Sequence, residues 1–339
     1  MRLRLGAVML LLALRITAAQ PPAAIPPVDP LPLPAFDVWL TELRTEAETR
    51  GIRAEVLDRA LAGLEPVAQI LERDRTQAEF SFTLDGYLKR RLTPPTLRTA
   101  RAKYKQHHSL VARIGRAYGI DPRLLISVWG LESNFGRFAG VRPTIPTLAT
   151  LAYDPRRGAM FRAELFNALE IVNRGDIELE RLKGSWAGAL GQPQFMPSSY
   201  LRYAQDFDGD GRRDIWSSAP DVFASVAFYL QQHGWRPNRL WGREVFVPPE
   251  VAGVLDDLPR RTEGCRARRE MSLPQPLNAW RKLGLKTVGR QPLPAAAVQA
   301  SLVRDASRAF LVYDNYDALL DYNCAHSYAL SVALLADRL

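Results

Sequence analysis

The chain has 339 residues, of which 47% are hydrophobic and 24% are charged. This composition is typical of globular proteins and excludes a disordered, collagen-like or disulfide-scaffold chain. The length predicts two or three domains. The formal net charge is +9, but no basic helix with interleaved aromatic residues stands out, so we expect no nucleic-acid partner. The two cysteines match neither a zinc cluster nor a CxxC pair, so the sequence predicts neither zinc nor thiol chemistry.

Residues 1–19 have the pattern of a secretory signal peptide. Two arginines are followed by an apolar run from Leu5 to Leu14 and then by small residues, which is the expected order. The run is too short to span a bilayer, and Arg15 interrupts it. We therefore expect cleavage near Ala19, export to the periplasm and no lipid anchor, because no cysteine lies at that site. Cleavage lowers the charge from +9 to +6, since three arginines and no acid are lost.

The rest of the chain is predicted to be mainly α-helical with a small β insertion. Residues 20–35 carry seven prolines and predict an extended linker. Apolar spacing and capping residues predict helices over 36–50, 52–62 and 93–119, and a last helical segment over 327–339. Short β-branched and aromatic runs predict strands over 244–247, 286–288, 300–303 and 309–313.

One glutamate lies on the apolar row of a predicted helix. Asp121 is a favourable N-cap and Pro122 a favourable first helical residue. The row through Leu124 and Val128 continues to Glu132, near the C-terminal end of the helix. Burial and the negative helix end both disfavour the ionised form, so we expect a raised pKa and a neutral carboxyl that can protonate a glycosidic oxygen. From the spacing alone, a structural glutamate that extends to water remains the alternative.

The sequence around Glu132 resembles a known family of enzymes. The string ESNFG over 132–136 is similar to the Glu-Ser/Thr-x-aromatic-Gly signature of lytic transglycosylases, which cleave the glycan strands of peptidoglycan. The segment 184–216, which includes FMPSSY and an acidic loop, resembles the membrane-bound lytic murein transglycosylase B family. The resemblance extends over residues 36–339.

The resemblance implies a lysozyme-like catalytic core flanked by a helical domain and a late inserted β domain. With this organisation we expect a helical domain over 36–105, the catalytic core over 106–240, a β-rich domain over 241–315 and a return to the core over 316–339.

The resemblance also implies that Glu132 is the single catalytic acid and base. It would protonate the scissile oxygen and then deprotonate the muramoyl 6-hydroxyl, which attacks C1 to give a 1,6-anhydro product. The implied partner is the peptidoglycan glycan strand, with cell-wall synthesis or remodelling proteins as further partners, and we expect a monomer. Two alternatives remain: a hydrolytic muramidase with a second acid such as Asp154 or Glu164, and a non-catalytic glycan-binding protein.

Matching motifs assign further residues to the sugar cleft. Their aromatic faces suit the CH surfaces of sugars, and their hydroxyl and amide groups suit N-acetyl and hydroxyl groups; core packing is the alternative for each tyrosine. The implied residues are Tyr87, Ser185, Gln194, Phe195, Tyr229, Tyr322, Asn323 and Tyr328. In one place the chain departs from the family, which has Gly-Tyr-Gly-Gln where this chain has Gly191-Gln192-Pro193-Gln194. The proline makes the role of Gln194 less secure.

An acidic loop over 206–217 has the spacing of an EF-hand calcium loop. The candidate ligands are Asp206, Asp208, Asp210, Arg212 and Asp214. The twelfth position is Ser217 instead of the usual glutamate, so we expect weak, structural binding of Ca²⁺ or Na⁺. No cofactor is predicted for catalysis. A solvated acidic turn is the alternative.

Export would place Cys265 and Cys324 in an oxidising compartment. A disulfide between them would join the β-rich domain to the segment of Asn323. The sequence alone leaves open whether they are instead two small buried residues.

Overall fold

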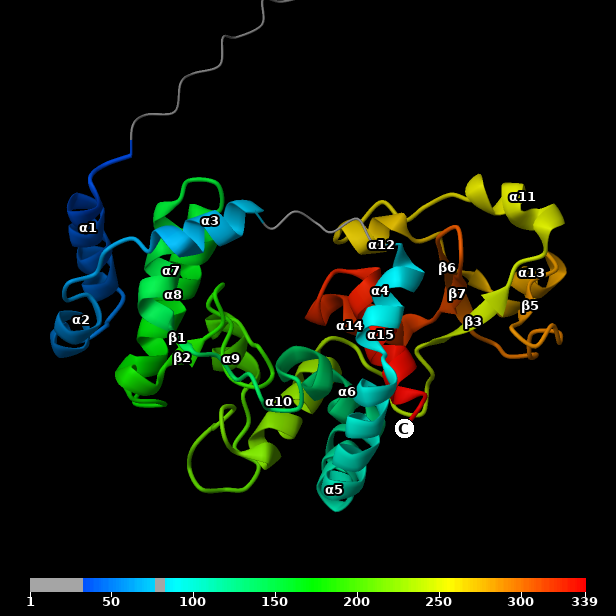
Figure 1. Ribbon diagram of the computed structural model, residues 1–339, viewed down its shortest axis with the longest axis horizontal. Helices are drawn as coiled ribbons and strands as arrows, with labels where there is room; N and C mark the ends of the chain where they lie inside the picture. Colours follow the sequence, from blue (N-terminus) through cyan, green and yellow to red (C-terminus); the bar gives the residue numbers. More distant parts are fainter. Residues whose placement is uncertain (1–32, 77–82) are drawn as a thin grey trace, which may run out of the picture. The chain divides into compact units, whose positions relative to one another are not determined.

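The structure is a computed structural model that describes residues 33–76 and 83–339. The fold is mainly helical with one five-stranded sheet, which confirms the predicted fold class (Figure 1). The predicted signal peptide and linker residues 20–32 lie outside the described residues. Residues Phe36–Leu339 form one compact unit. No helix in the described part of the chain combines the length and apolar character needed to cross a membrane.

The helices are α1 (Phe36–Thr49), α2 (Ala54–Ala60), α3 (Ala68–Thr76), α4 (Leu84–Arg91), α5 (Pro94–Tyr118), α6 (Pro122–Ser133), α7 (Thr144–Tyr153), α8 (Gly158–Asn173), α9 (Pro197–Tyr203), α10 (Ala219–Gln232), α11 (Ala252–Asp256), α12 (Arg266–Glu270), α13 (Leu277–Lys282), α14 (Asp314–Tyr322) and α15 (His326–Ala336). The strands are β1 (Arg142–Pro143), β2 (Lys183–Gly184), β3 (Gly242–Phe246), β4 (Gln275–Pro276), β5 (Lys286–Thr287), β6 (Gln299–Arg304) and β7 (Ala309–Val312). Each strand and helix predicted from the sequence has its counterpart here within a few residues.

Local capping explains why α5 and α6 begin and end where they do. The Thr93 hydroxyl caps α5 by accepting a hydrogen bond from the Thr96 amide, and Gly119 ends the helix in the left-handed conformation at φ 72°. The Asp121 carboxylate then accepts from the Arg123 amide at 2.9 Å and starts α6. These caps are the ones that the sequence predicts.

Apolar side chains gather into three cores. The first lies between α5, α6, α10, α14 and α15, and contains Leu125 and Phe223. The second lies between α1, α2, α7, α8 and α9, and contains Leu148 and Leu165. The third belongs to the β-rich part and surrounds Trp280. The proposed divisions at 105/106, 240/241 and 315/316 remain predictions.

The five-stranded sheet has the order β4-β6-β7-β3-β5, and every neighbouring pair is antiparallel. Phe310 on the central strand β7 pairs with Val303 on β6 and with Glu244 on β3. A disulfide joins Cys265 to Cys324, which decides the alternative that the sequence left open. It links the start of α12 to the turn between α14 and α15, and so ties the β-rich part to the helices that follow it.

Candidate active site

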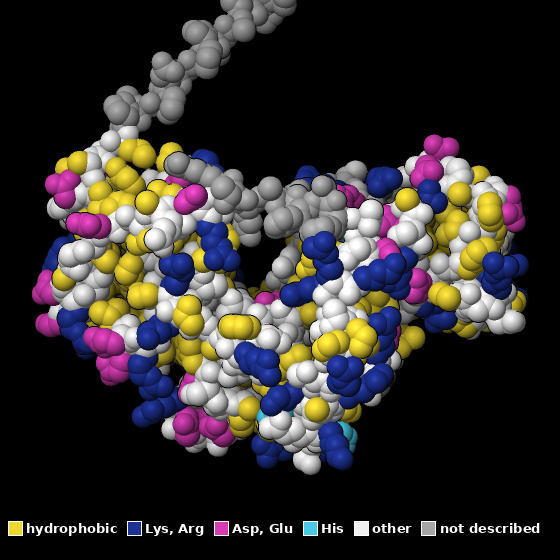
Figure 2. Space-filling view, viewed as in Figure 1, with side chains coloured by type: hydrophobic (Ala, Val, Ile, Leu, Met, Phe, Trp, Pro, Cys, Tyr) yellow, Lys and Arg dark blue, Asp and Glu magenta, His cyan; other side chains and the backbone are white. Residues whose placement is uncertain are grey.

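Glu132 lies in the last turn of α6. Its helix packs against both α5 and α15, and Leu124 and Val128 of its apolar row are buried. Glu132 itself is half-buried, because the row reaches the edge of the core at the end of the helix. On the face shown in Figure 2, the surface is hollowed between the helices α7 to α9 and the helices α4 and α14.

Burial raises the pKa of the Glu132 carboxyl to about 7. The Tyr328 hydroxyl and the positive charge of Arg91 both favour the ionised form and limit this rise. A carboxyl with this pKa is substantially protonated near neutral pH and readily changes its protonation state there. This behaviour is what the apolar row predicts and what a group that first donates and then accepts a proton needs.

Arg91, at the end of α4, is the cation beside Glu132. Its Nη2 donates a hydrogen bond of 2.9 Å to the carbonyl oxygen of Leu131, the residue before Glu132. Its Nε is buried and has no hydrogen-bond partner among the described residues. Sequence reasoning missed this residue, although it lies only four positions after Tyr87, an implied cleft residue.

Two predicted cleft tyrosines lie next to Glu132. The Oη of Tyr328 is buried and makes no hydrogen bond of ordinary geometry within the described residues, yet it is close enough to Glu132 to influence its pKa. Burial, and then the charge of Glu132, raise the pKa of the Tyr322 hydroxyl well above its ordinary value. The Tyr322 and Tyr328 rings stack with centroids 6.3 Å apart. Both hydroxyls therefore stay protonated and can donate hydrogen bonds.

An aromatic row continues from Tyr322 away from Glu132. The ring centroid of Tyr322 is 4.8 Å from that of Tyr229 and 6.0 Å from that of Phe195. The Tyr229 hydroxyl donates to the Asp321 carbonyl at 2.7 Å, and both Tyr229 and Phe195 are buried. These two buried rings pack beside Tyr322, which is half-buried.

In the loop before α9, the side chains of the predicted site residues Ser185 and Gln194 make hydrogen bonds within the loop itself. The Ser185 hydroxyl accepts hydrogen bonds from the Ala187 and Ala189 amides. Gln194 has a left-handed backbone with φ 55°, and its amide donates to the Gly191 carbonyl at 2.8 Å. Both side chains are half-buried. Pro193, one of the two residues that depart from the family, accepts a hydrogen bond of 2.8 Å from the Tyr322 hydroxyl through its carbonyl oxygen.

Gln192 joins this loop to the catalytic helix. Its Oε1 accepts from the Trp129 indole at 2.6 Å, and its Nε2 donates to the Trp216 carbonyl at 2.6 Å. Trp129 lies one turn before Glu132 on α6. Sequence reasoning noted Gln192 only as a departure from the family, and its type and position gave no sign of these two contacts.

The turn after Glu132 has an uncommon backbone. Asn134, Phe135 and Gly136 all have positive φ angles, of 50°, 58° and 81°. The Phe135 ring folds back onto α6, where a side chain at Gly130 would lie 2.5 Å from it. The Ser133 hydroxyl accepts from the Gly136 amide at 3.1 Å and stabilises the turn. Besides supplying the Glu132 carboxyl, the ESNFG string therefore forms the turn that follows α6.

The other two predicted cleft residues, Tyr87 and Asn323, have side chains with fewer contacts than those described above. Tyr87 is half-buried on α4, which packs against α15. Its side chain has no hydrogen bond or ring contact among the described residues. Asn323 is exposed at the end of α14, directly before Cys324.

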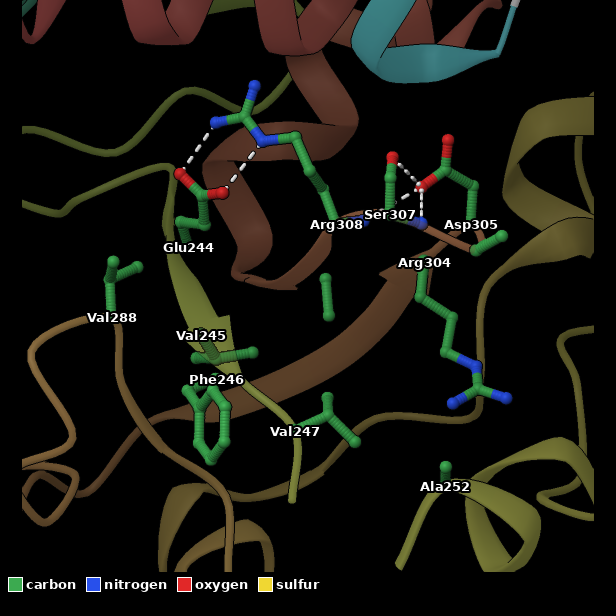
Figure 3. A pocket seen from close by; sticks show the side chains of 12 residues that line it. Glu244, Val245, Phe246, Val247, Ala252, Val288, Arg304, Asp305, Ser307 and Arg308 are labelled. Carbon is green, nitrogen blue, oxygen red and sulfur yellow. Dashed lines mark hydrogen bonds and ion pairs between the residues drawn. The ribbon is translucent and has the colours of Figure 1, made fainter. Parts of the chain in front are cut away.

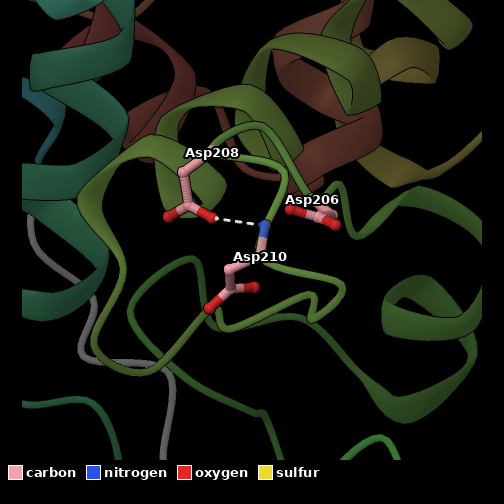
Figure 4. A group of neighbouring side chains, drawn as sticks. All are labelled: Asp206, Asp208 and Asp210. Atoms are coloured by element: carbon pink, nitrogen blue, oxygen red, sulfur yellow. Dashed lines mark hydrogen bonds between the residues drawn. The ribbon is translucent and has the colours of Figure 1, made fainter.

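The acidic loop brings three of its five candidate ligands together. One carboxylate oxygen each from Asp206, Asp208 and Asp210 lies within 4.8 Å of the others (Figure 4). Asp214 is not part of this group, because its carboxylate accepts the amides of Trp216 and Ser217. The Arg212 side chain does not belong to it either, and its amide donates to Asp210 at 2.8 Å.

A buried aspartate outside the motif holds this loop in place. Asp221 at the start of α10 accepts from the amides of Phe207 and Asp214, at 2.8 and 2.9 Å. The three converging carboxylates suit a hard cation such as Ca²⁺.

The two acids considered for a hydrolytic mechanism are engaged elsewhere. Asp154 accepts from Arg156 at 3.1 Å. Glu164 accepts both the amide and the hydroxyl of Ser198, at 2.8 and 2.6 Å. Neither is among the groups that influence the pKa of Glu132.

A separate cavity of about 360 Å³ lies in the β-rich part (Figure 3). Its charged side chains are paired: Arg308 with Glu244 at 2.6 Å, Arg304 with Asp256, and Asp305 with the Ser307 hydroxyl at 2.8 Å. We therefore assign no chemistry to this cavity.

Residues 35–337 match the family described as "Transglycosylase SLT domain". The chain belongs to this family. It is 37% identical over 150 residues to the membrane-bound lytic murein transglycosylase B of Escherichia coli (strain K12). That match covers 44% of this chain and 41% of the relative, so it spans less than half of the relative's length.

Two solved structures cover more of the chain. SltB3 from Pseudomonas aeruginosa, in complex with NAG-anhNAM-pentapeptide, has a TM-score of 0.81 and 39% identity, over 89% of this chain and 78% of that chain. The Escherichia coli lytic transglycosylase Slt35, in complex with calcium, has a TM-score of 0.72 and 26% identity, over 91% of this chain and 94% of that chain. The lysozyme-like helical fold expected from the resemblance is thus shared with solved lytic transglycosylases.

Proposed function

We propose that the protein is a lytic transglycosylase that cleaves the β-1,4 bond between MurNAc and GlcNAc in peptidoglycan. The observation that carries this proposal is the Glu132 carboxyl, which burial brings to a pKa of about 7 at the end of a helix in the family's fold. SltB3 binds a product of this chemistry, an anhydro-muramoyl pentapeptide.

In the first step, Glu132 donates its proton to the glycosidic oxygen and the C1–O4 bond breaks. The N-acetyl group of the substrate stabilises the positive charge that develops at C1. In the second step, the Glu132 carboxylate removes the proton of the muramoyl 6-hydroxyl while that oxygen bonds to C1. The product ends in 1,6-anhydromuramic acid, no water is consumed, and Glu132 regains its proton.

The groups around Glu132 suit both halves of this cycle. Arg91 and the Tyr328 hydroxyl stabilise the carboxylate between the two steps, and burial restores the neutral acid afterwards. We assign Tyr322 to the wall that contacts the sugar, with Phe195 and Tyr229 packed beside it. We keep Tyr87, Ser185, Gln194 and Asn323 as proposed substrate contacts.

A hydrolytic muramidase is the second candidate, since a water molecule in place of the 6-hydroxyl would give hydrolysis. The pairing of Asp154 with Arg156 and of Glu164 with Ser198 argues against it. A non-catalytic glycan-binding protein would gain nothing from a desolvated carboxyl.

Mass spectrometry of products released from purified sacculi in H₂¹⁸O tests the proposal. A transglycosylase yields 1,6-anhydro ends without ¹⁸O, whereas a hydrolase yields reducing ends that carry ¹⁸O. Glu132→Gln should lower the release rate by at least about 100-fold, and Glu164→Gln, the matched control, should keep it. Reducing ends from the wild type, or full activity of Glu132→Gln, would contradict the mechanism.

We further propose that Asp206, Asp208 and Asp210 hold a structural Ca²⁺. The convergence of three carboxylates supports this, and Slt35 has been solved with calcium. The cation would stabilise the loop before α10 and take no part in the reaction.

We also propose that the protein acts in the periplasm after removal of residues 1–19. The disulfide supports an oxidising compartment. Amino-terminal sequencing of the protein from its host should find Gln20 as the first residue. An intact Met1 would contradict this.

A further inference from the structure

The longest helix of the described chain is also strongly basic. The helix α5 contains six lysine and arginine residues and no aspartate or glutamate. They are Arg98, Arg101, Lys103, Lys105, Arg113 and Arg116. On the face shown in Figure 2, Lys and Arg side chains gather over α4 and α5, where Asp and Glu side chains are sparse.

Five of these cations share one side of the helix. At 3.6 residues per turn, Arg98, Arg101, Lys105, Arg113 and Arg116 fall within about 120° of the helix circumference, and all five are exposed. We call this set the α5 stripe. It extends about 27 Å along the helix, at 1.5 Å per residue. The opposite side of α5 is in the first core, so the stripe is the outward face.

Carboxylates do not neutralise the stripe. Arg98, Lys105 and Arg116 have no hydrogen bond, ion pair or ring contact among the described residues. Arg101 donates to a backbone carbonyl, that of Arg338, at 3.1 Å, and Arg113 lies over the Phe207 ring at 5.0 Å. Other exposed arginines, such as Arg50 and Arg59, do have acidic partners, Glu46 and Glu180.

The stripe continues into a groove of about 720 Å³ at the C-terminal end of α5. Arg116 belongs to both, and Ala112 on the same helix also lines the groove. The groove also contains Pro122, Pro237, Leu240 and a second cation, Arg239, which is 3.8 Å from the carboxylate of Asp314. The one acid in its lining, Asp121, is paired with Arg123 at 2.5 Å. A surface of small and apolar side chains flanked by arginines suits a short peptide that bears carboxylates.

The position of the stripe relative to Glu132 indicates a role with the same polymer. The first turn of α5 begins at Pro94, three residues after Arg91, which contacts Leu131 beside Glu132. The stripe therefore begins near the catalytic end of α6 and extends away from it. An extended anionic polymer held in the cleft would bring its neighbouring charged groups to this face.

We propose that the α5 stripe and its groove bind the carboxylate-bearing peptide stems of peptidoglycan outside the catalytic cleft. The identity of the polymer rests on the proposed function, whereas the preference for carboxylates rests on the stripe alone. A bilayer surface fits less well, because the face between the cations carries only small side chains such as Ala102 and Ser109, with no large apolar group to insert.

Binding of the inactive Glu132→Gln protein to purified sacculi tests the proposal without digesting them. The stripe variant adds Arg98→Gln, Lys105→Gln and Arg116→Gln. The matched control adds Arg281→Gln, Lys282→Gln and Lys286→Gln, which lower the charge equally. These are exposed cations of the β-rich part whose side chains have no partner among the described residues. Unchanged melting temperatures would show that both triple variants fold.

The stripe variant should bind sacculi at least about fivefold more weakly at low ionic strength, while the control changes less than twofold. High salt should remove the difference, because exposed charges are screened. Glycan strands stripped of their peptides should bind both variants equally.

Equal weakening by both variants, or a defect that persists on peptide-free glycan, would overturn the proposal. So would normal sacculus binding combined with lost binding to vesicles containing phosphatidylglycerol, which would make the stripe a membrane surface. Because the assay uses an inactive protein, its failure is separate from the failure of the transglycosylase proposal, which the products of the wild type decide.

Discussion

The Arg91 guanidinium donates a hydrogen bond of 2.9 Å to the carbonyl oxygen of Leu131. This contact places a cation from α4 next to the last turn of α6, where its charge lowers the pKa of Glu132 against the effect of burial. Two helices that are distant in the sequence thus set the protonation state of one carboxyl.

Replacing Arg91 should move the pH dependence of activity. Glu132 must be protonated to donate, so kcat/KM falls as the pH rises through its pKa of about 7. Arg91→Gln removes a charge that lowers this pKa, so the alkaline limb should shift to higher pH. Arg91→Lys keeps the charge and should keep the limb near its original position. A shift of the alkaline limb to lower pH in Arg91→Gln would contradict the prediction that the Arg91 charge lowers the pKa of Glu132.

Removal of the Glu132 carboxyl should stabilise the protein at alkaline pH. Its pKa is about 7 in the folded protein against an ordinary value of 4.5, so ionisation weakens folding as the pH rises from 4.5 through 7 and the cost is absent below that range. The loss is at most about 3 kcal/mol. Urea unfolding should find Glu132→Gln more stable than the wild type at pH 8, with a smaller difference at pH 4.5. Equal differences at both pH values would argue against a desolvated carboxyl.

The hydroxyls of Tyr322 and Tyr328 should differ in what they contribute. Tyr322→Phe loses the 2.8 Å hydrogen bond to Pro193 and should lower the free energy of unfolding by about 1 kcal/mol. Tyr328→Phe loses no hydrogen bond of ordinary geometry, so its stability should change little. Its pH profile should shift to higher pH, because the nearby hydroxyl no longer lowers the pKa of Glu132. Denaturant titrations and pH profiles of both variants would test this contrast, and it fails if Tyr328→Phe is the less stable of the two.

Gln192 should contribute to the stability of the protein, whereas Gln194 should contribute to substrate binding. Gln192→Ala breaks two hydrogen bonds and leaves the buried Trp129 indole without its acceptor, which should cost about 2 kcal/mol or more. Gln194→Ala breaks one contact within its own loop and should raise KM with little loss of stability. Thermal unfolding and steady-state kinetics separate the two effects. A larger loss of stability in Gln194→Ala than in Gln192→Ala would contradict this prediction.

Calcium should raise the melting temperature through the acidic loop. At 100 times the dissociation constant, a ligand specific for the folded state stabilises it by about 2.7 kcal/mol. Asp210→Asn should reduce this response, since it removes one of three converging charges. Asp257→Asn changes an exposed acid elsewhere and should leave the response intact. Scanning calorimetry with Ca²⁺ and with a chelator measures the shift in melting temperature. A shift in Asp210→Asn equal to that of the wild type would place the ion elsewhere.

Local signals made α5, α6 and the position of Glu132 predictable. Thr93, Gly119 and Asp121 act through neighbours within a few residues, so their types determine where the helices begin and end. The apolar row of α6 likewise follows from its spacing. Inferred export suggested a disulfide between the only two cysteines, but the sequence alone left open whether they pair.

Side-chain directions were not predictable in this way. The motif identified Asp214 as a ligand, but the turn at Ser217 and the buried Asp221 orient it away from the other carboxylates. Arg91 reaches Glu132 only because α4 packs against α15 beside α6. The α5 stripe was missed for a related reason. Its cations are not regularly interleaved with aromatic residues, and the sequence did not reveal that their side chains lack acidic partners from neighbouring elements.

The bridge between Cys265 and Cys324 has a consequence for how the protein can be produced. The two cysteines are 59 residues apart, and a loop of this length restricts the unfolded chain enough to be worth about 4 kcal/mol. Protein made in a reducing cytosol would lack this contribution and would be prone to proteolysis and aggregation. Recombinant material should therefore be secreted or refolded under oxidising conditions, and its thiol content checked, before any preparation is judged inactive.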